Sequence, residues 1–118
     1  MNPLKAVKYI MTTDLVTVEP TESAQNIREI FEQSDFHHIP VVTLGNQLTG
    51  IISKDDFRKF YYMLSRNTTG KTLTGLELSN VKAEEFMTKF PVSLDPEDSI
   101  GLAADIFMAN KFHALPVT

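Results

Sequence analysis

The residue types and spacing best suited to chemistry are a hydroxyl and a carboxylate three positions apart, Ser53 and Asp56. They follow two β-branched residues, Ile51 and Ile52, which favour a buried strand. A helix that begins at Ser53 would present unpaired N–H groups and a partial positive charge, and both favour phosphate. The Asp56 carboxylate, one turn into that helix, could accept hydrogen bonds from sugar hydroxyls. The pattern therefore predicts a site for a ligand with phosphate and sugar groups.

The same spacing is also typical of a capping box, in which Ser53 and Asp56 would only satisfy backbone donors at the start of a helix. These residues alone leave both interpretations open.

The segments that must position this site alternate between short apolar strands and amphipathic helices. We expect a short helix at 3–11, a strand at 16–18, a helix that carries Ala24 to Phe31 and fades at 34–35, strands at 38–42 and 48–52, and a helix from 53 to about 64. The turn at 44–47 predicts that the strands on either side of it are antiparallel neighbours. Residues 63–80, rich in Gly, Thr, Ser and Asn from 65 onward, predict a linker or mobile loop.

The chain repeats itself when it is shifted by 76 residues. Eleven identities fall between 11 and 41 without a gap, among them Met11 with Met87, Pro20 with Pro96 and Pro40 with Pro116. Two copies indicate a pseudo-twofold pair rather than a solenoid. We expect a first copy with a helical lead-in at 1–62, the linker at 63–80 and a second copy at 81–118.

The second copy stops at Thr118, so counterparts of residues 43–62 are missing from it. We expect an unpaired strand and an exposed apolar helix face as a result, and both favour association with another chain.

With these motifs in view, the chain resembles a tandem CBS-domain pair, or Bateman module. The resemblance is carried by segments at 9–12, 16–20, 36–42 and 50–56, and in the second copy by 86–88, 91–96 and 112–117. It implies an α/β (α+β) fold of two β-α-β-β-α repeats related by a pseudo-twofold axis, with small sheets flanked by helices. It also implies clefts between the repeats in which adenosine-containing ligands such as AMP, ATP or S-adenosylmethionine often bind.

By the same resemblance, Asp56 would hold the ribose hydroxyls and Ser53 would contact ribose or phosphate. Lys54 and Arg58, on the first turns of the helix, could meet phosphates. The base would lie between strand residues, and the implied contacts are Val16, Thr17, Ile39, Pro40 and Ile52, with Val92 and Leu115 from the second copy.

Composition and charge limit the other functions. The net charge of −4 predicts no general attraction to nucleic acid or to anionic membrane, and the absence of cysteine excludes disulfides and thiolate sites. The N-terminus lacks the apolar core of a signal peptide, and no apolar run approaches the roughly 20 residues that span a bilayer, so we expect a soluble cytoplasmic protein. His37 and His113 occupy equivalent positions in the two copies, which favours a shared structural role over metal ligation.

The sequence therefore predicts a regulatory module that is not itself an enzyme, holds no metal or cofactor, binds an adenosyl ligand and forms a homodimer. The alternative is a structural dimerisation module without a small-molecule ligand, in which Ser53 and Asp56 only cap a helix.

Overall fold

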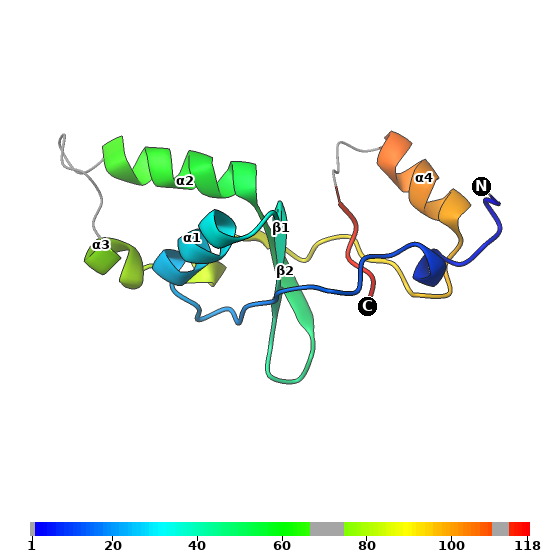
Figure 1. Ribbon diagram of the computed structural model, residues 1–118, viewed down its shortest axis with the longest axis horizontal. Helices are drawn as coiled ribbons and strands as arrows, with labels where there is room; N and C mark the ends of the chain where they lie inside the picture. The colour runs from blue at the N-terminus through cyan, green and yellow to red at the C-terminus, as the bar shows by residue number, and fades with distance from the viewer. Residues whose placement is uncertain (1, 67–74, 110–113) are drawn as a thin grey trace. The chain divides into compact units, whose positions relative to one another are not determined.

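Two packing units organise the chain in the computed structural model, which describes residues 2–66, 75–109 and 114–118. One unit is continuous, Val16–Phe90, and the other joins Met1–Leu15 to Pro91–Thr118. In chain order the elements are η1 (Val7–Tyr9), α1 (Ala24–Gln33), β1 (His38–Val42), β2 (Leu48–Ser53), α2 (Lys54–Arg66), α3 (Gly75–Ser79), η2 (Ala83–Glu85), β3 (Thr88–Lys89) and α4 (Ile100–Ala109) (Figure 1).

A three-stranded antiparallel sheet in the order β1-β2-β3 forms the framework of the 16–90 unit. β1 and β2 pair as a hairpin, with Ile39 opposite Ile52 and His38 opposite Ser53. Asn46 has a φ of 60° in the connecting turn, a left-handed conformation that asparagine tolerates well. The predicted hairpin is confirmed.

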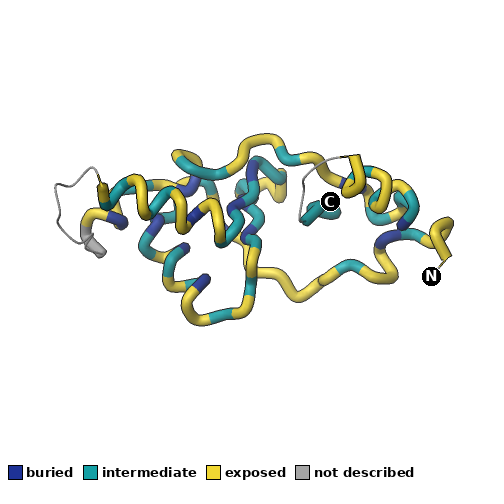
Figure 2. Tube along the Cα trace, turned by 90° about the horizontal axis from the view of Figure 1, so that it is seen from above, coloured by how far each residue is buried: buried dark blue, intermediate teal, exposed yellow. Residues whose placement is uncertain are grey.

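Helices α1 and α2 supply the aromatic part of the core in this unit. Ser23 caps α1, since its hydroxyl accepts a hydrogen bond from the Asn26 amide at 3.1 Å. Along α2 only Phe57 is buried, and the other residues are exposed or half-buried. Figure 2 shows the degree of burial along the chain, with buried positions separated by half-buried and exposed ones. The ring of Phe57 lies 5.8 Å from that of Phe31 on α1 and 5.8 Å from that of Phe86 near β3. The core also contains Val18, Ala24, Ile27, Ile39, Val41, Ile52, Leu78 and Ala83.

The same three backbone hydrogen bonds occur in both units, displaced by the repeat length of 76 residues. In the 16–90 unit they run from Ala24 N to Val81 O, from Ala83 N to Glu22 O and from Glu84 N to Pro20 O, at 2.8, 2.8 and 3.0 Å. In the other unit they run from Ile100 N to Lys5 O, from Val7 N to Asp98 O and from Lys8 N to Pro96 O, at 2.8, 2.8 and 3.1 Å. Each repeat therefore packs with the segment that leads into the other repeat.

Because the two repeats exchange their lead-in segments in this way, the packing units do not coincide with the repeats along the sequence. The boundaries expected at 1–62, 63–80 and 81–118 describe the repeats and stay a prediction. Helix α2 continues to Arg66 and α3 spans Gly75–Ser79, so the expected linker is helical at both described ends. Residues 67–74 lie outside the described part of the chain.

The unit formed by 1–15 and 91–118 has a smaller core. Val7, Leu94 and Ile100 are its buried residues, with Leu115 and Val117 packed against them. Leu94 pairs with Val117 in a parallel bridge, the counterpart of the bridge between Val18 and Val41 in the other unit.

Two expected elements are wrong in extent. Residues 3–11 do not form a helix beyond the single turn Val7–Tyr9, because the backbone of this stretch is used in hydrogen bonds to residues 96–101. Residues 16–18 do not form a full strand, since Val18 alone makes a bridge to β1. Within the described residues, no helix has the length and hydropathy needed to cross a membrane.

Candidate functional site

The predicted hydroxyl and carboxylate lie where β2 ends and α2 begins. The hydroxyl of Ser53 accepts a hydrogen bond from the Asp56 amide at 3.0 Å, so Ser53 does cap α2. The amide of Lys54 donates to the carbonyl of His37 at 2.8 Å, which fixes the helix start against the residue that precedes β1. Local sequence explains this arrangement, because a serine after a β-branched run both ends a strand and begins a helix.

The reciprocal half of a capping box is missing. Across residues 2–66, 75–109 and 114–118, the Asp56 carboxylate accepts no hydrogen bond and forms no ion pair, and the residue is exposed. Its neighbour Asp55 differs, since an Asp55 oxygen lies 3.8 Å from an Arg58 guanidinium nitrogen. The cap therefore needs the hydroxyl of Ser53 but not the carboxylate of Asp56.

The predicted strand contacts share the same unit as Ser53 but differ in exposure. Ile39 and Ile52 are 0% and 1% exposed, so their side chains belong to the core and only their backbone could meet a ligand. Val16 and Thr17 are exposed, and Pro40 is half-buried. The Val18 amide donates to the Pro40 carbonyl at 3.1 Å, which holds the 16–18 segment alongside β1.

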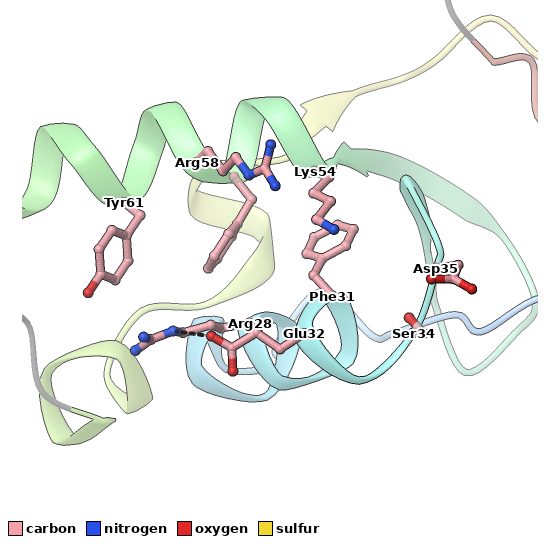
Figure 3. Close-up of a pocket in the computed structure, with 9 residues that line it drawn as sticks. Arg28, Phe31, Glu32, Ser34, Asp35, Lys54, Arg58 and Tyr61 are labelled. Atoms are coloured by element: carbon pink, nitrogen blue, oxygen red, sulfur yellow. Dashed lines mark hydrogen bonds and ion pairs between the residues drawn. The ribbon is translucent and has the colours of Figure 1, made fainter.

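Lys54 and Arg58 lie on a different face of α2 from Asp56. Residues two apart on a helix do not face the same side, whereas Lys54, Phe57, Arg58 and Tyr61 follow helical spacing. Those four residues line a groove of about 480 Å³ between α1 and α2 (Figure 3). The structure thus divides the predicted contacts on α2 between two faces of the helix.

Val92 and Leu115 belong to the unit formed by 1–15 and 91–118. Val92 is 45% exposed, and Leu115 is half-buried beside Leu94 and Val7. Their predicted contact with a ligand held at Ser53 stays a prediction.

The histidines form no metal site in the described part of the chain, where no three His, Cys, Asp or Glu side chains gather to hold an ion. His37 is exposed and His38 begins β1, whereas His113 lies outside the described residues.

Sequence reasoning missed the α1 side of the groove. Arg28, Phe31 and Glu32 line it from α1. The signal was present, because Arg28 and Glu32 are four residues apart and flank Phe31, and their side chains pair at 3.0 Å.

Comparison with known proteins identifies the family. The family model for the CBS domain matches residues 7–62 and 83–118. An uncharacterised protein of Methanocaldococcus jannaschii, MJ1225, is 29% identical over 110 residues, which cover 91% of this chain and 38% of that relative. The chain spans between 20% and 38% of the length of the curated relatives that it matches.

Solved structures agree with this assignment. The crystal structure of MJ1225 superposes with a TM-score of 0.80 at 25% identity, covering 100% of this chain and 42% of that one. CBSX2, solved in complex with AMP, gives 0.73 at 23% identity and covers 97% of this chain and 82% of that one. The CBS domain pair of MJ0100, solved with 5′-methylthioadenosine and S-adenosyl-L-methionine, gives 0.73 at 21% identity, covering 98% and 82%. The matched residues make up most of the chain, and it belongs to the CBS-domain family as a tandem pair.

Proposed function

We propose that this chain is a regulatory module that binds an adenosyl ligand at the junction of β2 and α2. One observation carries the proposal. The Asp56 carboxylate is exposed and unpaired within the described residues, in the first turn of a helix whose start is capped by Ser53. A carboxylate in that position can accept two hydrogen bonds from a ribose, and the helix start favours phosphate.

Known complexes of the family support the ligand class. CBSX2 binds AMP, and the MJ0100 pair binds 5′-methylthioadenosine and S-adenosylmethionine. The shared chemical group is adenosine, which fits a site built to hold ribose hydroxyls. The proposed contacts are Ser53 and Asp56, the exposed Val16 and Thr17, Pro40, the backbone of Ile39 and Ile52, and Val92 and Leu115 from the other unit.

Ligand binding would act as a signal rather than begin a reaction. A ligand that touches both repeats stabilises the arrangement in which both contacts are made, so it shifts the population of conformations. We further propose that the chain is not itself an enzyme, holds no resident cofactor and works as a homodimer.

The test is isothermal calorimetry with AMP, ATP, S-adenosylmethionine and 5′-methylthioadenosine, at about 100 μM protein so that weak binding is detected. Asp56→Asn should weaken binding roughly tenfold or more, a loss of about 1.4 kcal/mol. Asp55→Asn is the matched control, since it removes the same charge from the same helix turn.

Both variants should lose a similar small amount of stability, because each removes a carboxylate from the first turn of a helix. Only Asp56→Asn should lose ligand binding. If both variants bind equally well, Asp56 plays no part in the site.

A second function has its own observation, the hydrogen bond from the Asp56 amide to the Ser53 hydroxyl. In a purely structural module that cap would be the whole purpose of the motif. Calorimetry that detects no heat with any of the four ligands, together with a dimer in solution, would favour this function.

A further inference from the structure

We propose that Phe90 is a specificity-determining residue of the adenosyl site, where its ring stacks on the adenine base. The role of Phe90 rests on the proposed function, because it adds a contact to the ligand held at Ser53 and Asp56. Its backbone conformation, the exposure of its ring and its place beside β2 all support this role.

The backbone of Phe90 is strained. Its φ is 51°, in the left-handed region, where a bulky residue is an outlier. Residue 91 is proline, which pushes the residue before it toward an extended conformation and so adds to the strain. The Phe90 amide donates to the Thr49 carbonyl at 3.1 Å, and this hydrogen bond just beyond β3 helps to hold the conformation. Strain of this kind gathers at binding sites, where it keeps a side chain in position for a ligand.

The internal repeat shows that the fold does not require this conformation. The residue that corresponds to Phe90 in the first copy, 76 positions earlier, is Asp14. Among the described residues other than glycine, only Asn46 and Phe90 have a positive φ, so Asp14 does not share it, although aspartate tolerates that region better. The strained backbone is therefore a property of the second copy alone.

The ring of Phe90 is left in water. Phe90 is 86% exposed, the highest value among the described phenylalanines, whereas Phe31 and Phe57 are 3% and 6% exposed. Phe86, four residues earlier, stacks on Phe60 with ring centroids 4.6 Å apart. The exposed ring of Phe90 can therefore receive a flat partner.

The register of the sheet places Phe90 along the line that the ligand would follow. Alternate residues of a strand share one face, and Thr49, Ile51 and Ser53 are those on the less buried face of β2. Pro40, already proposed as a contact, lies opposite Ile51. A strand rises about 3.3 Å per residue, so Thr49 lies about 13 Å from Ser53. An adenosine whose ribose meets the start of α2 and whose base passes over Ile51 points that base toward Phe90.

An aromatic ring suits this end of the ligand. Adenine presents a flat π-face, and stacking on it needs no hydrogen-bond partner. Phe90 would select for the base, while Asp56 selects for the ribose. The ligand class then requires an intact base, and a sugar phosphate without one binds poorly.

Phe90→Trp tests the contact directly, since the chain has no tryptophan of its own. The fluorescence of the single indole in the full chain is followed while AMP, S-adenosylmethionine or ribose 5-phosphate is titrated. We expect both adenosyl ligands to quench it saturably and to protect it from iodide, and ribose 5-phosphate, which lacks the base, to do neither. Leu44→Trp is the matched control, since Leu44 is 90% exposed in the hairpin turn of the same unit and should not respond.

Calorimetry then measures the effect on affinity. Phe90→Leu removes the ring and keeps an apolar side chain, so it should weaken adenosyl binding by roughly fivefold or more, the order expected for losing one stacking partner. Phe90→Tyr keeps a ring and should bind as the wild type does. Circular dichroism confirms that each variant is folded.

Unchanged adenosyl affinity in Phe90→Leu, or equal quenching in the Phe90→Trp and Leu44→Trp variants, would overturn the role of Phe90 and leave the proposed function standing. Equal losses in Phe90→Leu and Phe90→Tyr would also overturn it, because the ring would then not be what the ligand needs. If the wild type binds no adenosyl ligand, the assignments of Phe90 and Asp56 fall together.

Discussion

Gly50 allows the segment that leads into the second repeat to pack against the first repeat, and replacing it tests that contact. A Cβ at Gly50 would lie 2.3 Å from Met87 Sδ, 2.8 Å from Met87 Cγ and 3.0 Å from the Thr88 carbonyl oxygen. The methionine side chain can move aside, but the carbonyl belongs to β3, which pairs with β2 at this position. Gly50→Ala therefore forces an adjustment of either β3 or β2.

The magnitude follows from two opposing effects. Overpacking of this kind costs about 1–3 kcal/mol. The loss of glycine flexibility in the unfolded chain offsets this by about 0.4–1 kcal/mol. We expect a net destabilisation of roughly 1–2 kcal/mol, which corresponds to a fall of about 4–8 °C in Tm for a chain of this length.

Gly45→Ala is the matched control, because a Cβ there would meet only the Thr43 hydroxyl at 3.9 Å. Urea unfolding followed by circular dichroism compares the two variants. The double variant Gly50→Ala with Met87→Ala then separates the two clashes, since removing the methionine side chain should make Gly50→Ala less costly than it is alone. Equal stability of Gly50→Ala and Gly45→Ala would refute the close packing of β3 on β2.

Two further predictions concern the core and the exchanged segments. Phe57→Ala should destabilise the protein by about 3–5 kcal/mol, because its ring is buried between Phe31 and Phe86. The control Tyr62→Ala, at a site 62% exposed, should change the free energy of unfolding by less than about 0.5 kcal/mol. Thermal unfolding measures both variants. A fragment of residues 16–90 should unfold cooperatively and one of residues 7–62 should not, because the shorter fragment lacks the buried Leu78 and Ala83. Equal cooperativity of the two fragments would contradict the packing of the first repeat with the segment that leads into the second.

Much of the 16–90 unit could be predicted from the sequence because its signals are local. The turn at 44–47 fixes the hairpin, and Ser53 ends a strand and begins a helix through its own hydroxyl. The internal repeat and its motifs were enough to indicate the family.

The sequence could not reveal which lead-in packs with which repeat. That arrangement depends on backbone hydrogen bonds such as the one between Ala24 and Val81, which carry no side-chain signature. The same reason explains the wrong helix at 3–11, whose helical spacing gave way to pairing with residues 96–101.

The ligand contacts proposed for the candidate site stay a prediction. The position of Ser53 and Asp56 at the start of α2 follows from spacing along the chain, whereas the sequence does not show which neighbours the other side chains of α2 meet. Only the packing of α1 against α2 shows that Lys54 and Arg58 line a groove with Phe31.

The exchange of lead-in segments also constrains how such a duplicated gene can change. Deleting one copy cleanly at the repeat boundary would remove the strip of backbone that pairs with residues 20–24 of the survivor. A surviving first copy would have to replace that strip with its own lead-in at residues 5–8, which makes the equivalent hydrogen bonds to residues 96–100 in the intact pair.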